Sequence, residues 1–161
     1  MRAINASKHL LSRVNKERFE DIGDGISNLK LQKLLYFIQK VHYSVYHEPF
    51  FDDTIEAWRH GPVVPTIYHH FKEYGRSDID IFKEEDFIKD KEPLNINQIG
   101  VVDFVWDAYY QYSGGALIDI SHQDKCWIDN VAFSGTINLH EMEDVDTKEE
   151  FLKYERILNE L

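Results

Sequence analysis

Residues 29–75 read LKLQKLLYFIQKVHYSVYHEPFFDDTIEAWRHGPVVPTIYHHFKEYG, and this stretch decides the fold. Apolar residues in its first half recur with the 3.6-residue period of a helix: Leu31, Leu34, Leu35, Ile38, Val41 and Val45. Four aromatic residues widen that apolar surface beyond one stripe: Tyr36, Phe37, Tyr43 and Tyr46. A helix that is apolar on most sides usually lies at the centre of its domain, and we expect this one to do so.

The second half of the stretch changes its pattern. Pro49 ends the helix, and residues 54–58 alternate and carry β-branched side chains, as a short strand does. Gly61 and Pro62 then mark a turn. Pro65 suits the first position of a further helix, and Gly75 suits the position just past its end. The sequence therefore predicts a small β ribbon near residues 50–64, followed by a helix.

The rest of the chain is also mainly helical. We expect a helix over residues 3–14, a central helix capped by Ser27, and further helices over residues 95–112 and 116–121, with a break at Gly114-Gly115. Residues 78–92 are charge-rich and predict a surface excursion with one or two short elements. In residues 141–161, an acidic strip leads to a last helix, and Asp146 with Glu149 three residues on predicts a capping box at its start. Its expected buried face comprises Phe151, Tyr154, Leu158 and Leu161. The prediction is a mainly α, single-domain fold over residues 1–161 with about five or six helices.

Composition excludes several classes of protein. No apolar run approaches the roughly 20 residues that a membrane span needs, and the N-terminal segment lacks the apolar core of a signal peptide. The 29 acidic residues exceed the 18 Lys and Arg residues, giving a net charge of −11. This surplus argues against nucleic-acid binding and suits a basic protein partner. The single cysteine, Cys126, allows no internal disulfide, and a reducing cytoplasm is the expected location.

No complete catalytic set emerges from the polar residues. His69 and Glu73 are four residues apart and His60 precedes them, but such a pair is more often a surface pair than a metal site. Cys126 follows His122 by four residues and sits between an acidic neighbourhood and an indole, which disfavours a reactive thiolate. We therefore expect no enzyme activity, no metal and no cofactor.

The polar and aromatic residues around the Gly61-Pro62 turn suggest protein binding rather than catalysis. Trp, Tyr and Arg are the residues that most often anchor protein interfaces. We interpret the surface around the turn as partner-binding, and its residues are Trp58, Arg59, His60, Gly61, Pro62 and Tyr68. The alternative is structural: the same residues hold the strand against the central helix.

These motifs together resemble the Panacea domain, the domain of the SocA-like antitoxins, which are often described as phage-associated. The resemblance spans about residues 5–130. The helix motif corresponds to Leu31, Gln32, Lys33, Leu34, Leu35 and Tyr36. The turn motif corresponds to Glu56, Ala57, Trp58, Gly61, Pro62 and Val63. A later Ser/Thr-His and Pro-Trp element corresponds to Ser121-His122 and Cys126-Trp127, with cysteine in place of the usual proline.

The resemblance implies an antitoxin that neutralises a cognate toxin encoded beside it by direct binding. For the SocA type it also implies an adaptor that delivers the toxin to the ClpXP protease. Two alternatives stay open. One is a hydrolase or nucleotide-modifying enzyme that uses His60, His69 and Glu73, and the other is a phage-encoded regulator without a toxin partner.

Overall fold

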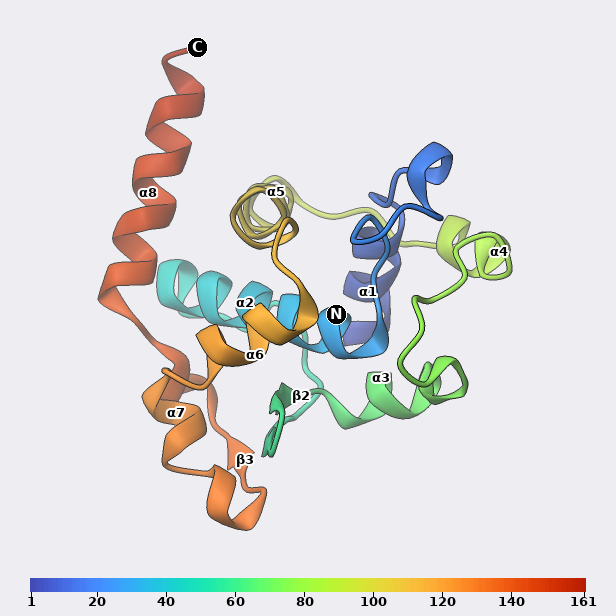
Figure 1. The fold of residues 1–161 in the computed structure, drawn as a ribbon. Coiled ribbons are helices and arrows are strands. Elements are labelled where there is room, and N and C mark those ends of the chain that lie inside the picture. Colours follow the sequence, from blue (N-terminus) through green and yellow to red (C-terminus); the bar gives the residue numbers. More distant parts are fainter.

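Helix α2 runs through the middle of the molecule in the computed structural model, which describes all residues 1–161, and the other elements surround it (Figure 1). The α-helices are α1 (Ala3–Leu11), α2 (Asn28–Tyr46), α3 (Pro65–His70), α4 (Glu85–Lys89), α5 (Ile96–Tyr109), α6 (Gly114–Ser121), α7 (Lys125–Ile128) and α8 (Val145–Asn159). The 3₁₀ turns are η1 (Lys16–Arg18), η2 (Lys72–Tyr74), η3 (Val131–Phe133) and η4 (Leu139–Met142). The predicted mainly helical class is confirmed, but there are eight α-helices rather than five or six. The two that the prediction did not count, α4 and α7, have five and four residues, too few to display a helical period.

The central helix α2 is enclosed as expected. The Ser27 Oγ accepts a hydrogen bond from the backbone N–H of Lys30 at 3.2 Å, which confirms the predicted cap. Fifteen of the 19 residues of α2 are buried, among them several polar ones. The helix ends at Tyr46, before the expected stop at Pro49, because His47 takes a left-handed conformation with φ of 56° and its N–H donates to Tyr43 O.

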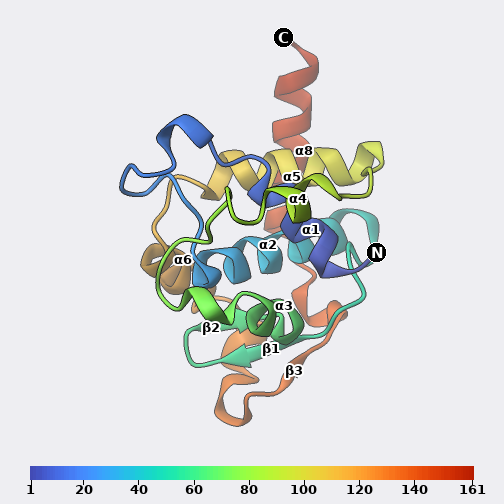
Figure 2. The ribbon, with the colours of Figure 1, turned by 90° about the vertical axis from the view of Figure 1, so that its right-hand side faces the viewer.

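A three-stranded antiparallel sheet lies below α2 in Figure 2, with α5 above that helix. Strand β1 (Ile55–Trp58) is central, flanked by β2 (Gly61–Val63) and β3 (Thr136–Ile137). The first two strands confirm the predicted ribbon. The prediction missed β3, because two residues carry no readable alternation and the strand pairs with a segment about 80 positions earlier in the chain.

Other predicted boundaries are also wrong, three of them at α1, α5 and α6. Helix α1 ends at Leu11 rather than at residue 14, and α5 ends at Tyr109 rather than at residue 112. The third is the Gly114-Gly115 pair, which forms the first turn of α6 instead of a break. The Ser113 Oγ accepts from the Ala116 N–H at 3.1 Å and caps that turn, which favours helix over the low helix propensity of glycine.

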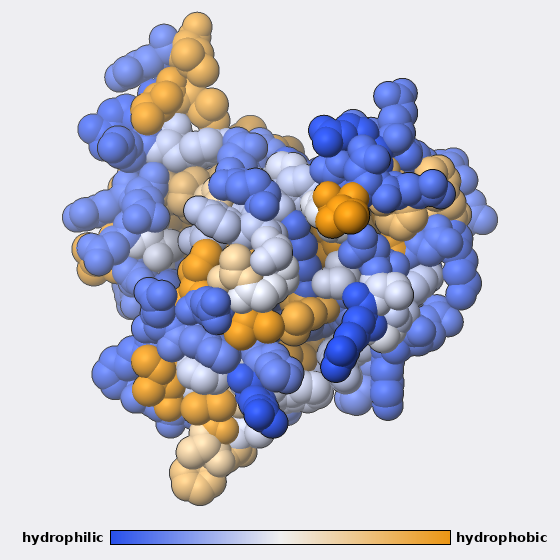
Figure 3. All heavy atoms as spheres, in the orientation of Figure 1, coloured by the Kyte–Doolittle hydropathy of each residue, from blue (hydrophilic) through white to orange (hydrophobic).

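Helix α8 projects beyond the body of the molecule (Figure 1). Its cap is Asp144 and not the predicted Asp146: the Asp144 carboxylate accepts from the N–H groups of Asp146 and Thr147, and the helix begins at Val145. Phe151 is buried, but Leu158 and Leu161 of the expected buried face are 47% and 97% exposed. They lie past the crossing with α5, and hydrophobic residues, coloured orange, are visible at this end of α8 in Figure 3. No helix combines the length and apolar character that a membrane span requires.

Candidate functional site

Strands β1 and β2 form a tight hairpin whose connecting residues are Arg59 and His60. The next residue, Gly61, has φ of +100°, a conformation that side-chain-bearing residues rarely adopt. A Cβ at this position would lie 2.5 Å from the Lys33 Cε and 2.7 Å from the Ser121 Oγ. Glycine is therefore required at this position for two reasons. Its backbone conformation is left-handed, and the side chains of α2 and α6 leave no room for a Cβ.

Two polar side chains of α2 bind the free edge of β2. The Lys33 Nζ donates to the carbonyl of Pro62 at 2.9 Å, and the Gln32 Oε1 accepts from the backbone N–H of Val64 at 2.9 Å. Pro62 has no N–H of its own, so this edge keeps no unpaired donor there. Backbone groups that are buried without a partner are costly, and α2 supplies those partners.

The same row of side chains continues to α3. The Gln32 Nε2 donates to the Asn28 Oδ1 at 2.9 Å, and the Asn28 Nδ2 donates to the carbonyl of Tyr68 at 2.9 Å. One hydrogen-bonded chain thus connects the helix motif, the hairpin and the helix after it. The polar residues of the helix motif hold the backbone of the turn in place.

Lys33 is an unusual member of this chain. Its side chain is fully buried, and no carboxylate pairs with it. Burial lowers the pKa of the Lys33 ammonium to about 7, since a charge is poorly solvated there. The hairpin is consequently held by an amine whose protonation changes near neutral pH.

The later motif adds further hydrogen bonds to the hairpin. The Trp127 Nε1 donates to the carbonyl of Trp58 at 2.7 Å. The His122 Nε2 lies 3.1 Å from the carbonyl of Arg59, and because a carbonyl can only accept, the imidazole hydrogen belongs on Nε2. The two rings stack with centroids 3.8 Å apart. The turn backbone is therefore held by both motifs, while the side chains of Arg59 and His60 stay exposed.

A cavity of about 200 Å³ opens beside the turn, between β1, β2, α2 and α3. The Trp58 and Tyr68 rings meet edge to face within it, with centroids 5.0 Å apart. The Trp58 indole N–H donates to the Glu56 carboxylate at 2.7 Å, which fixes the orientation of the ring. The lining residues are Asn28, Leu29, Gln32, Trp58, Arg59, His60, Val63, Tyr68 and Gly75. The arrangement combines apolar walls with exposed polar side chains at the opening, which suits the binding of a protein segment.

The hairpin, with Gln32, Lys33, His122 and Trp127, falls within one matched region. The sequence model of the family described as antitoxin SocA-like, Panacea domain matches residues 31–128, from the helix motif through α7. The chain belongs to this family. No curated protein and no solved structure matches the chain.

In this Panacea domain some motif residues are exposed or half-buried and others are buried. Trp58 and Tyr68 are half-buried and Arg59 and His60 are exposed. Gly61, Pro62 and Val63 are buried, so Gly61 and Pro62 shape the turn and offer little surface to a partner. The helix motif and Ala57 are buried as well, which makes them supports of the site rather than contacts.

The enzyme alternative assumes that His69 and Glu73 lie on one helix, and the structure does not place them so. Helix α3 ends at His70, so Glu73 falls in the separate turn η2 and no longer stands one helical turn from His69. The Glu73 carboxylate lies 3.3 Å from the Lys83 ammonium. No group of three or more His, Cys, Asp and Glu side chains gathers in a way that could hold a metal ion.

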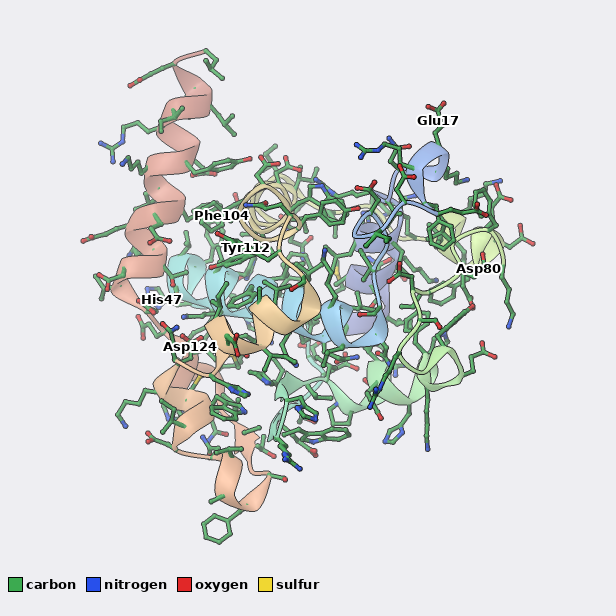
Figure 4. All side chains as sticks on the ribbon, in the orientation of Figure 1. Glu17, His47, Asp80, Phe104, Tyr112 and Asp124 are labelled. Carbon is green, nitrogen blue, oxygen red and sulfur yellow. The ribbon has the colours of Figure 1, made fainter.

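A second polar cluster lies on the other half of α2 and was not predicted from the sequence. The Asp124 Oδ2 accepts from the Tyr36 hydroxyl at 2.6 Å and from the Lys40 ammonium at 3.0 Å. The same ammonium lies 3.1 Å from the Asp144 carboxylate, and the Cys126 Sγ lies 3.0 Å from the Tyr36 hydroxyl. Asp124, labelled in Figure 4, thus connects the start of α7 to α2, and Asp144 connects the start of α8 to it.

Burial and neighbouring charges shift the pKa values of the groups in this cluster. Burial by itself lowers the pKa of Lys40, but the Asp124 and Asp144 carboxylates outweigh it and raise that pKa above its usual value. Burial raises the pKa of the Cys126 thiol, and burial likewise raises the pKa of the Tyr36 hydroxyl. A thiol whose pKa is raised is a poor nucleophile, so Cys126 does not suit catalysis. The cluster instead connects α2 with the starts of α7 and α8.

Proposed function

We propose that this protein is an antitoxin that neutralises a cognate toxin by direct binding, and that the contact surface is the β1–β2 hairpin with the cavity beside it. Membership of an antitoxin family supports the first part. The observation that carries the second is the cavity of about 200 Å³ that adjoins the exposed Arg59 and His60.

The rigidity of the hairpin favours this assignment. Binding is weakened when loops and side chains must be ordered on contact. The backbone of the turn is already bonded by Lys33 and by His122 and Trp127. A partner therefore meets a preformed surface, and the ordering cost falls mainly on the two exposed side chains.

The test is growth rescue together with co-purification. The protein is co-expressed with the product of the neighbouring gene, and a double Arg59→Ala, His60→Ala variant is compared with the unaltered chain. We expect the variant to fold normally and to lose rescue, since truncating an interface anchor costs about 2 kcal/mol or more. Lys153→Ala is the matched control, because Lys153 is an exposed cation on α8. Full rescue by the folded double variant contradicts the contact surface.

Gene context and protein turnover test the remaining parts of the proposal. A toxic neighbouring product that co-purifies with this chain supports the antitoxin over a regulator without a toxin partner. For the adaptor role in the cytoplasm, the half-life of that toxin is compared in cells with and without ClpXP. A half-life that is equal in the two strains contradicts delivery to this protease and leaves direct neutralisation intact.

A further inference from the structure

The turn η3 carries the most exposed aromatic side chain of the protein. Phe133 is 90% exposed, whereas Phe82 and Tyr112, which follow it, are 53% and 42% exposed. Ile128, on the helix α7 that packs against η3, is 53% exposed as well. Figure 3 shows hydrophobic residues, coloured orange, in this lower part of the surface. An aromatic ring in water gains free energy when a partner covers it, so Phe133 is a candidate contact residue.

The backbone around Phe133 is firmly held. The Asn130 Nδ2 donates to the carbonyl of Cys126 at 2.7 Å, and the carbonyl of Asn130 accepts from the Gly135 N–H at 3.0 Å. Between them, Ser134 takes a left-handed conformation with φ of 48°, which is uncommon for a residue with a side chain and turns the chain back toward β3. The ring is therefore presented by an ordered turn, and little backbone entropy is lost when a partner binds it.

The sheet places this turn beside the hairpin. Strands β1 and β3 pair antiparallel, and the Ala57 N–H donates to the carbonyl of Gly135 at 2.9 Å, which extends their register by one residue past β3. Two residues further, the same register sets Phe133 level with Arg59. In Figure 2 the orange turn that precedes β3 lies below the sheet. The exposed side chains of Phe133, Arg59 and His60 thus lie at the same end of the sheet.

Phe133 differs from the hairpin in its relation to the family. The family model matches residues 31–128, which include the hairpin, and Phe133 follows the matched region. The hairpin is therefore a family feature of the surface, and Phe133 is a feature that the family match does not account for. Such a residue is suited to distinguish the partner of this chain from other proteins.

We propose that Phe133 is a second anchor of the toxin-binding surface and inserts into an apolar pocket of the toxin, beside the contacts of Arg59 and His60. This rests on the proposed function and specifies the partner as a protein with a concave apolar pocket for one aromatic ring. Continuity with the hairpin through the β1–β3 register favours the same partner for both. A second copy of the chain is a poorer occupant, because each copy carries a net charge of −11 and the two repel.

Titration calorimetry of the purified protein with the product of the neighbouring gene tests the proposal. Phe133→Ala should weaken binding at least roughly thirtyfold, the loss typical of an interface anchor. Phe133→Leu should lose less, because it keeps most of the apolar area. Ile96→Ala is the matched control: Ile96 is 80% exposed at the start of α5, on the opposite side of α2 from the sheet, and should bind normally. Phe133→Ala should also keep the urea midpoint of the unaltered chain, since its ring has few contacts to lose.

Each other outcome overturns the inference in an identifiable way. Unchanged affinity in Phe133→Ala overturns it and leaves the hairpin as the contact surface. A lowered urea midpoint in that variant shows a structural role for the ring instead. If the protein alone sediments as a dimer that Phe133→Ala dissociates, a second copy covers the ring and the toxin pocket is wrong. If the unaltered chain does not bind the neighbouring product, the proposed function fails, and this inference with it.

Discussion

The buried amine of Lys33 should make the stability of the protein depend on pH in a specific direction. Burial lowers the pKa of Lys33 to about 7 in the folded protein, whereas a lysine in an unfolded chain has a pKa of about 10.4. Between these two values the unfolded chain holds more protons than the folded one. Stability therefore rises as the pH rises from about 7 toward about 10.4, and the protein is least stabilised below that window.

The size of the effect follows from the proton count. Up to about pH 9 the unfolded chain keeps nearly a full proton on this amine, while the folded protein goes from half-protonated near pH 7 to almost unprotonated. At 1.36 kcal/mol per proton and pH unit, the free energy of unfolding should rise by about 2 kcal/mol over this range. Lys33→Met removes the titration and keeps an unbranched side chain. It also leaves the Pro62 carbonyl without its donor, which costs about 1–3 kcal/mol at every pH.

The assay is urea unfolding followed by tryptophan fluorescence at several values between about pH 7 and about pH 9. The quantity compared is the difference in unfolding free energy between the unaltered protein and Lys33→Met. Burial raises the pKa of the Cys126 thiol, which acts in the opposite direction with pH, but both proteins share it and the difference cancels it. Lys153→Met serves as the exposed control and should give a flat difference. A flat difference for Lys33→Met as well would refute a lowered pKa at this site.

Two further predictions concern the hairpin and the second polar cluster. Gly61→Ala should destabilise the protein by more than about 2 kcal/mol, because the new methyl group meets the Lys33 side chain and the backbone conformation is strained. Gly115→Ala, in the first turn of α6, places its methyl group in ordinary contact with the Ser113 Oγ at 3.9 Å and should be neutral or stabilising by up to about 1 kcal/mol. Equal thermal melts of the two variants would contradict the packing argument. Asp124→Asn should cost about 1–3 kcal/mol, because it removes the charge that faces Lys40. A double-mutant cycle with Lys40→Met measures that coupling, and a coupling energy near zero would mean that the pair contributes nothing.

Local sequence signals predicted the elements that are stabilised locally. The period of α2, its Ser27 cap and the proline that starts α3 are all readable within one or two turns of chain. The low helix propensity of glycine predicts a break at Gly114-Gly115, but the capping hydroxyl of Ser113 favours a helix there. The prediction that the end of α8 is buried is wrong for a different reason. Its apolar period continues past α5, but no element lies opposite it, and a pattern within one helix cannot show where the body of the molecule ends.

The candidate site was predicted in part. The residue types and the turn predict the hairpin as the candidate surface, and the structure gathers Trp58, Arg59, His60 and Tyr68 around one cavity. The sequence did not show that Gly61 and Pro62 are buried, nor that Arg59 lacks a carboxylate partner. Both depend on side chains and segments that the fold brings together from elsewhere in the chain.

The sequence by itself determined the family, the mainly helical class and the place of the hairpin, because these follow from short-range periodicity, caps and turn residues. Only the tertiary structure decided what the polar residues of α2 do. Gln32 and Lys33 bind backbone atoms about 30 residues ahead, and Lys40 meets carboxylates more than 80 residues ahead. Their spacing along the helix resembles that of an ordinary solvent-facing side. It is the enclosure of α2 on all sides that turns them into buried donors and acceptors, which must find partners because water cannot reach them.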